Sequence, residues 1–195
     1  MAGTIIVVGS APCLFSDLEK ALQLRPFAAV LLVNGACTAV ENADHVLSGH
    51  TDKAEVFAAG RRTAFPKAPP WRLHATIDTR RIQEAMQLFP SVTDWHSKNI
   101  CTGATSIAKG AKLGFALGFE EVILAGAPMG GSGYAATECK TSHYCKRVGD
   151  ATAQAHRVIQ GYRLKLKKLA DGEFKNKVFS MSGYTRECLG EPPRV

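Results

Sequence analysis

Short turns that carry glycine, hydroxyl or amide groups follow several apolar segments of the chain. The run TIIVV at 4–8 is directly followed by Gly9, Ser10, Ala11 and Pro12. A glycine lets the backbone approach a ligand without a Cβ clash, Ser10 adds a hydroxyl and an N–H donor, and Pro12 stiffens the turn. Such a turn can hold a phosphate-bearing ligand, or it is a tight connection that binds nothing.

The same turn argues against two common phosphate-binding motifs. It lacks the second and third glycines of the dinucleotide pattern GxGxxG, and the chain contains no GxxxxGK[ST] sequence. We therefore expect neither an NAD fingerprint nor a P-loop.

A second group of hydroxyl side chains lies at the expected start of a helix. The sequence CTGATS at 101–106 opens a helix predicted for 103–117. A helix N-terminus presents unpaired N–H groups and a partial positive charge, to which hydroxyl groups add donors. We expect an anion site here or, alternatively, simple capping of the helix. The residues concerned are Thr102, Gly103, Thr105 and Ser106.

Apolar runs alternate with helical patterns along the whole chain. Strands are predicted at 4–8, 28–33, 45–48, 73–77, 121–125 and 177–181. Helices are predicted from an N-cap at Ser16, over about 53–61, from 78 or 79 to 88, over 103–117 and from 150 to 169, and 90–99 is expected to be irregular. This order predicts an α/β fold, namely one Rossmann-like three-layer domain over 1–195 with a mostly parallel sheet.

The helix predicted for 103–117 contains Gly110 and Gly114 among several alanines. Each glycine costs a helix about 1 kcal/mol relative to alanine. We expect the compensating gain to be a close approach of this helix to the sheet.

The carboxyl ends of parallel strands meet at one edge of a sheet, where ligands bind in open α/β folds. Five turns are therefore expected to converge there and to form one binding rim. They lie at 9–12, 34–35, 50–52, 126–128 and 182–183, and they add Asn34, Gly35, Gly126 and Ser182 to the candidate ligand-binding residues.

Composition is that of an ordinary globular domain. The 195 residues are 46% hydrophobic and 21% charged, with a net charge of +7. No apolar run reaches the roughly 20 residues of a membrane span, and the N-terminus lacks the basic region of a signal peptide. We expect a cytoplasmic protein whose six cysteines are reduced.

Two further patterns have simple explanations. Cys139, His143 and Cys145 could suggest zinc, but the chain has no CxxC pair and no obvious fourth ligand, so we expect a plain loop and no metal site. Cations gather on the predicted long helix, where the helix dipole favours them near the C-terminus. They could also grip a DNA backbone. These cations are Arg157, Arg163, Lys165, Lys167 and Lys168.

The order of these motifs resembles that of two related families. The turn GSAPCL is similar to the GxGPSL turn of the Rossmann-like bacterial sialyltransferases and of 6-hydroxymethylpterin diphosphokinase-like proteins. The likeness continues through TGATS, LGFEEVILAGAP, GGSGYA, SHY and the long helix. It implies nucleotide binding, with Gly9, Ser10, Ala11 and Asn34 at the phosphates and sugar. It also implies that Thr102, Gly103, Thr105 and Ser106 hold the base or ribose.

The resemblance also implies catalytic positions. The sialyltransferases use a histidine shortly after a loop as general base, and tyrosines that stabilise the leaving phosphate. His143 lies close to the histidine position, an ungapped alignment places Arg147 there, and Tyr134 lies near one tyrosine. The chain departs from the pattern at Pro128, where an aspartate is usual, and at Cys13, where a serine is usual.

A general base that works near neutral pH is best supplied by histidine. We rank His143 first, followed by His50 and His96 in polar segments near the expected rim. His45 and His74 lie within predicted strands and are expected to be structural.

Together these observations predict a nucleotide-dependent transferase. The leading hypothesis is a glycosyltransferase that uses a nucleotide sugar as donor, has no permanently bound cofactor and acts on an acceptor that could be nucleic acid. One alternative is a diphosphokinase-like enzyme that uses ATP and Mg²⁺, and another is a non-catalytic nucleotide-binding module. The oligomeric state is left open.

Overall fold

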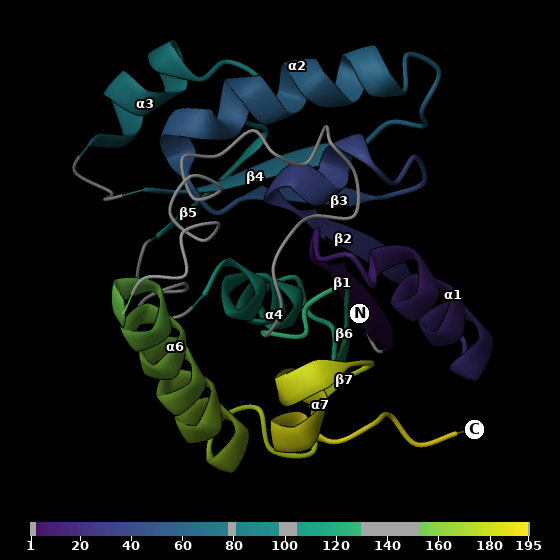
Figure 1. Ribbon diagram of the computed structural model, residues 1–195. Coiled ribbons are helices and arrows are strands. Elements are labelled where there is room, and N and C mark those ends of the chain that lie inside the picture. Colours follow the sequence, from purple (N-terminus) through teal and green to yellow (C-terminus); the bar gives the residue numbers. More distant parts are fainter. Residues whose placement is uncertain (1–2, 78–80, 98–104, 130–152, 195) are drawn as a thin grey trace.

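In the computed structural model, seven parallel strands form one sheet in the order β5-β4-β3-β2-β1-β6-β7 (Figure 1). The structure describes residues 3–77, 81–97, 105–129 and 153–194, except the side chains of 153–159. The strands are β1 (Thr4–Val8), β2 (Ala29–Val33), β3 (His45–Ser48), β4 (Arg72–Ile77), β5 (Asp94–Ser97), β6 (Glu121–Ala125) and β7 (Val178–Ser180). The predicted α/β class with a mostly parallel sheet is confirmed.

Helices cover both faces of this sheet, which makes three layers (Figure 1). Helices α1 (Leu14–Leu24), α2 (Ala54–Ala64) and α3 (Ile82–Leu88) lie on one face, and α4 (Ser106–Ala116) and α6 (Ala153–Asp171) lie on the other. Short 3-10 turns η1 (Asn34–Thr38) and η2 (Thr51–Lys53) follow β2 and β3, and α7 (Gly183–Leu189) follows β7.

The central strands are apolar on both faces because both faces are covered by helices. In β1, Ile6 and Val8 contact the α1–α2 side, whereas Ile5 and Val7 contact the α4 side. All five residues of β1 are buried. Their continuous apolar sequence therefore predicted the strand correctly.

Helix α4 lies unusually close to the sheet, as its glycines predicted. A Cβ at Gly110 would lie 2.6 Å from Val7 Cγ1, and one at Gly114 would lie 2.9 Å from Ile5 Cγ2. The two glycines thus lie against β1, and the absence of their side chains sets the distance between α4 and the sheet.

The direction of the connections reverses at β1. The chain leaves β1 through α1 to β2, whereas it leaves β5 through α4 and returns to β6 on the other side of β1. In open α/β sheets the carboxyl ends of strands at such a reversal are the preferred place for a ligand. The reversal lies between β1 and β6, so the turns after these two strands flank it.

The predicted N-cap at Ser16 is wrong. Helix α1 begins at Leu14 after Cys13, and the Ser16 hydroxyl donates to the Cys13 carbonyl at 3.1 Å. The turn after β1 is only a few residues long, and Leu14 is fully buried against the sheet. The helix therefore starts as soon as the chain has turned, two residues before the sequence signal.

Other helices and strands differ from the prediction in their bounds or in their type. The segment predicted to be irregular at 90–99 contains strand β5, whose four residues are only half-buried because β5 is at the sheet edge. Helix α7 was not predicted. Helix α4 starts at Ser106 with Thr105 as its N-cap, later than predicted. The predicted caps at 78, 79 and 150 lie outside the described residues.

Candidate functional site

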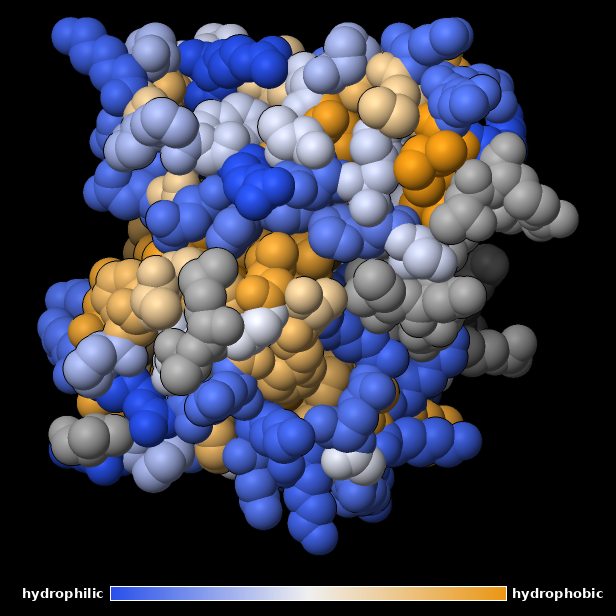
Figure 2. All heavy atoms as spheres, turned by 180° about the vertical axis from the view of Figure 1, so that it is seen from behind, coloured by the Kyte–Doolittle hydropathy of each residue, from blue (hydrophilic) through white to orange (hydrophobic). Residues whose placement is uncertain are grey.

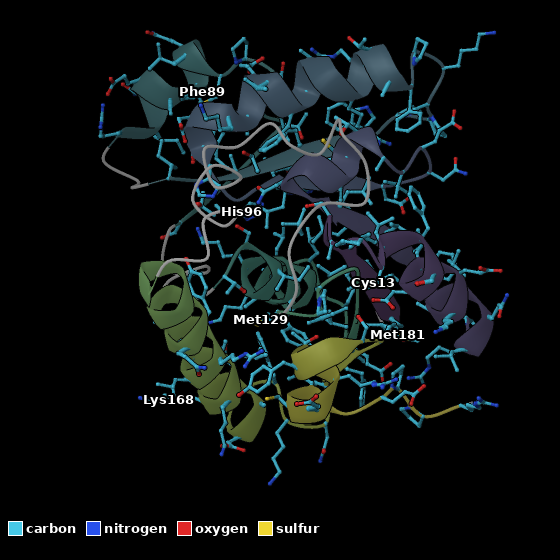
Figure 3. All side chains as sticks on the ribbon, viewed as in Figure 1. Cys13, Phe89, His96, Met129, Lys168 and Met181 are labelled. Atoms are coloured by element: carbon cyan, nitrogen blue, oxygen red, sulfur yellow. The ribbon has the colours of Figure 1, made fainter. Side chains whose placement is uncertain are left out.

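The five predicted turns all follow the carboxyl ends of parallel strands and therefore lie along one edge of the sheet. Figure 3 labels Cys13, Met129 and Met181, which follow β1, β6 and β7 and lie near the middle of the view. Hydrogen bonds and close contacts join the turns into two groups, one around β1, β6 and β7 and the other around β2, β3 and α4.

The turns after β1 and β6 are in direct backbone contact. Gly9 N–H donates to the Ala125 carbonyl at 2.8 Å, and Ala11 N–H donates to the Gly126 carbonyl at 3.1 Å. A Cβ at Gly9 would lie 2.5 Å from the Gly126 oxygen. The requirement for glycine at position 9 thus comes from the neighbouring turn, independently of any ligand. Ser10 is half-buried and Pro12 is exposed.

Asp17 joins the turns of this first group. Its side chain is 2% exposed, although it comes from the first turn of α1. Its Oδ2 atom accepts Gly126 N–H at 3.0 Å and also the hydroxyl hydrogen of Ser182. Cys13 Sγ lies 3.4 Å from Ser182 Oγ, and burial raises the pKa of the Cys13 thiol. Ser182 therefore lies at the rim, as predicted, but donates its proton inward.

Asp17 was missed by sequence reasoning. The available signal was an acidic residue in the first turn of the helix that follows a rim turn, a position that the helix dipole favours. Burial of a carboxylate is costly unless hydrogen bonds compensate it. We infer that Asp17 positions the rim rather than contacting a ligand.

The second group of turns is centred on Gly49. Asn34, whose φ is 52°, accepts Gly49 N–H through Oδ1 at 2.7 Å. Lys109 Nζ donates to the Gly49 carbonyl at 3.1 Å, and a Cβ at Gly49 would lie 2.7 Å from Ser106 Oγ. The structure thus brings the predicted residues Asn34 and Ser106 together, with the buried Gly35 adjacent to Asn34.

The predicted anion site at the start of α4 is described only in part. Thr105 Oγ1 accepts Ala108 N–H at 3.3 Å, so this hydroxyl caps the helix. Ser106 is half-buried beside Gly49. Thr102 and Gly103 lie outside the described residues. Capping by Thr105 is therefore observed, whereas ligand binding by this segment stays a prediction.

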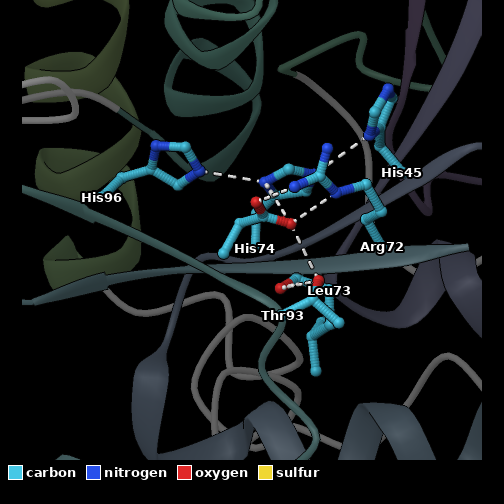
Figure 4. A network of polar contacts seen from close by, with 7 residues as sticks. His45, Arg72, Leu73, His74, Thr93 and His96 are labelled. Carbon is cyan, nitrogen blue, oxygen red and sulfur yellow. Dashed lines mark hydrogen bonds and ion pairs between the residues drawn. The ribbon is translucent and has the colours of Figure 1, made fainter. Parts of the chain in front are cut away.

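Three histidines form a chain of imidazole rings across the sheet, one each from β3, β4 and β5 (Figure 4). His45 Nδ1 lies 3.0 Å from His74 Nε2, and His74 Nδ1 lies 2.9 Å from His96 Nε2. Beside them, Arg72 forms an ion pair with Asp94, and Asp94 Oδ2 lies 3.8 Å from His74 Nδ1.

The histidine chain is held uncharged at neutral pH. Burial lowers the pKa of His74 to about 3 and also lowers the pKa values of His45 and His96, while Asp94 opposes these shifts. Thr93 and Arg72 donate to Asp94 and lower the pKa of its carboxyl, although burial alone would raise it. Each neutral ring has one donor and one acceptor nitrogen, which is what a chain of hydrogen bonds requires.

The catalytic candidates are only partly placed. His50 is exposed directly after β3, and its carbonyl accepts the Ser48 hydroxyl at 2.5 Å. His143, Arg147 and Tyr134 lie outside the described residues. His96, the remaining candidate, uses Nε2 to contact His74.

Two hollows in the surface lie at opposite edges of the sheet. The one at the carboxyl edge has a volume of about 280 Å³ and is lined by Thr51, Asp52, Thr76, Ile77, Arg81, Glu84, Ala85, Leu88 and Phe89. The larger one, of about 530 Å³, is lined by residues that precede β2, β3 and β4 and by part of α1, and so lies at the amino edge. Ligand binding in this class of fold favours the carboxyl edge.

The side of the molecule hidden in Figure 1 carries apolar surface across its middle, with polar surface above and below (Figure 2). Among the exposed large apolar side chains are Phe15, Leu22 and Phe27, which also line the larger hollow. Folded proteins commonly expose much apolar area, so this surface does not by itself indicate a binding site.

Within the described ranges, no three His, Cys, Asp or Glu side chains are grouped so that they could hold a metal ion. Cys139, His143 and Cys145 lie outside those ranges. Of the helices whose placement is described, none is long and apolar enough to cross a membrane.

The basic residues of α6 do not all lie on one exposed surface. Lys165, Lys167 and Lys168 are exposed, whereas Arg163 is half-buried and stacks on the ring of Tyr184. The side chain of Arg157 lies outside the described residues. A role of this helix in DNA binding has no structural support beyond its exposed lysines.

No family model matches the chain, and no curated protein sequence matches it. Solved structures do match. The sialyltransferase CstII from Campylobacter jejuni, in complex with the substrate analogue CMP-3FNeuAc, is 12% identical with a TM-score of 0.63, over 98% of this chain and 87% of that chain.

Two further structures agree with this result. The monofunctional alpha-2,3-sialyltransferase Cst-I from Campylobacter jejuni is 14% identical with a TM-score of 0.67, over 100% of this chain and 81% of that chain. A CST-II variant in complex with CMP is 14% identical with a TM-score of 0.64, over 98% of this chain and 87% of that chain. The chain therefore has the fold of the Campylobacter sialyltransferases, as the order of its motifs predicted.

Proposed function

We propose that the protein is a glycosyltransferase whose donor is a nucleotide-activated sugar. The observation that supports this most is the match of almost the entire chain to sialyltransferase structures that hold CMP or a CMP-sugar analogue. The fold alone does not determine function, because function resides in sites on the fold. The proposal therefore also depends on the polar carboxyl edge described above.

The donor would bind near β1, where the direction of the strand connections reverses. Its place would be between the turn after β1 and the start of α4. Ser10, Asn34 and Ser106 are the polar side chains of this region that remain half-buried rather than enclosed. Asp17 and Lys109 hold the surrounding turns in place through Gly126 and Gly49. A site whose turns are fixed before binding loses less entropy when the ligand arrives.

The reaction would proceed by attack of an acceptor hydroxyl on the anomeric carbon of the donor sugar. The bond between that carbon and the phosphate oxygen breaks, the nucleotide leaves with the bonding electrons, and a general base takes the hydroxyl proton. Of the two candidate bases that lie within the described residues, His50 is exposed at the carboxyl edge, whereas His96 contacts His74 through Nε2. His143 remains the first-ranked candidate from the sequence, with Arg147 and Tyr134 as further candidates.

Binding of nucleotides is the first test. Isothermal titration with CMP, UMP, AMP and GMP, followed by their sugar-bearing counterparts, should identify one base that binds. Absence of binding to every member of the panel would rule out the proposal.

Turnover is the second test. Release of nucleotide from the sugar donor, measured with and without EDTA, separates a glycosyltransferase from the alternative that uses ATP and Mg²⁺. His143→Ala, His50→Ala and His96→Ala should then be compared. If the wild type binds nucleotide but releases none from any sugar donor, a non-catalytic binding module is favoured. If turnover occurs and none of the three variants lowers it, the general base is another residue.

A further inference from the structure

Arg163 differs from the other cations of α6. Lys165, Lys167 and Lys168 are exposed, whereas Arg163 is half-buried with its Cζ atom 4.5 Å from the centre of the Tyr184 ring. Its Nη2 atom donates to the Met129 carbonyl across 3.5 Å, which is a long hydrogen bond. The side chain thus extends from α6 toward the end of β6.

This position lies at the binding edge of the sheet. Met129 follows the Gly126 turn, and the Tyr184 N–H donates to the Pro128 carbonyl at 2.9 Å. A Cβ at Gly183 would lie 2.5 Å from Pro128 Cβ, so the turns after β6 and β7 are tightly packed there. Figure 3 labels Met129 next to β7. Arg163 is therefore held against the same two turns that Asp17 joins.

The guanidinium group has unused donors. Its Nε is buried and has no acceptor among the described residues, and no described carboxylate forms an ion pair with Arg163. Arg61 also has a buried Nε without an acceptor, but its Nη1 and Nη2 atoms donate to three carbonyl oxygens, those of Cys37, Val40 and Glu41. Among the described residues, the terminal nitrogens of Arg163 make only the long bond to the Met129 carbonyl. The two arginines therefore differ in their terminal nitrogens.

Burying part of a cation whose donors lack acceptors costs free energy. An anion bound next to these donors would recover that cost. Phosphate matches this requirement because a guanidinium group can donate two parallel hydrogen bonds to it. We propose that Arg163 binds the phosphate of the nucleotide donor and stabilises the negative charge that builds on it as the sugar leaves. This inference rests on the proposed function. Tyr184 and the Met129 carbonyl fix the plane of the guanidinium group.

Binding of a phosphate by Arg163 makes a prediction that a purely structural role does not. Arg163→Met should weaken CMP binding at least tenfold while leaving cytidine binding unchanged, because cytidine lacks the phosphate. Arg163→Lys, which keeps the charge but loses the paired donors, should give a smaller loss. Lys167→Met, on the exposed part of the same helix, should bind CMP as the wild type does.

The experiment is isothermal titration of the full chain and its variants with CMP and cytidine, or with the matching nucleotide and nucleoside if the panel above identifies another base. Thermal denaturation shows whether each variant is folded. If Arg163→Met does not fold, Arg163→Lys takes its place in the titration. If the wild type binds a nucleotide and Arg163→Met binds it within twofold, or if nucleoside binding falls equally, the inference about Arg163 is wrong and the proposed function stands. If the wild type binds no nucleotide, both are wrong.

Discussion

The backbone of Gly9 and the backbone of Gly126 touch so closely that neither position has room for a side chain. A Cβ at either glycine would lie 2.5 Å from the carbonyl oxygen of the other. These two residues begin the turns that follow the neighbouring strands β1 and β6, at the point where the direction of the strand connections reverses. The contact explains a glycine for which the sequence left two alternatives open, a ligand and a tight connection that binds nothing.

Gly9→Ala should therefore destabilise the protein even when no ligand is present. Overpacking of a close contact costs typically about 1–3 kcal/mol, and here the neighbour is backbone that cannot rotate away. Urea denaturation of the unliganded protein measures this loss. Gly161→Ala is the matched control, since a Cβ there meets nothing within 4 Å, and it should stabilise α6 by up to about 1 kcal/mol. Equal stability of Gly9→Ala and the wild type would contradict the explanation.

Gly110→Ala tests the close approach of α4 to the sheet. The new Cβ would lie 2.6 Å from Val7 Cγ1, so we expect a loss of about 1–3 kcal/mol in the free energy of unfolding. Val7→Ala removes the atom in contact. In a double-mutant cycle measured by urea denaturation, the second change should recover part of the loss. If the two losses were strictly additive, the contact between position 110 and Val7 would not limit the distance between α4 and the sheet.

Asp17→Ala should cost about 1–3 kcal/mol, because the buried Gly126 N–H and the Ser182 hydroxyl would both lose their acceptor. Thermal denaturation provides the measurement. Ser16→Ala, one residue earlier on the exposed side of α1, should change stability by no more than about 0.5 kcal/mol. A loss at position 17 no larger than that at position 16 would mean that Asp17 does not join the turns.

The histidine chain predicts how stability depends on pH. His74 has a pKa of about 3 in the folded protein, whereas an unfolded histidine titrates near 6.5, so the unfolded state binds more protons between these values. Stability should be complete above pH 6.5 and should fall progressively as the pH drops toward 3. The measurement is the midpoint of urea denaturation across this range. In His74→Gln, which cannot titrate, the midpoint should change less with pH than in the wild type.

The elements that the sequence predicted well are those whose pattern is enforced by burial. Strands β6 and β1 contain continuous apolar runs, at 122–125 and 5–8, because helices cover both faces of the central strands. β5 was missed because an edge strand needs no such run, and its residues Asp94–Ser97 are half-buried and mostly polar. This segment is a strand because it pairs with β4, and such a pairing leaves no signal in the local sequence.

The sequence predicted where the candidate site lies, but it did not predict the contacts that hold the site together. Parallel strands must end at a common edge, which placed the turns at Gly9, Asn34 and Gly126 together. What joins them could not be predicted, because Asp17 and Lys109 act through contacts with turns far away in sequence. Arg163 was grouped with the other cations of the long helix, although its position three residues before the buried Leu166 places both on one side of α6.

The position of β1 in the sheet has a consequence for how the chain folds. Of the seven strands described, β1 is made first, but one of its two partners, β6, ends at Ala125. Until that residue has left the ribosome, one side of β1 exposes unpaired N–H and C=O groups, which are a template for wrong pairing. Pairing over such a separation is intrinsically slow. Chains that stop before β6 should therefore aggregate rather than form a smaller stable sheet.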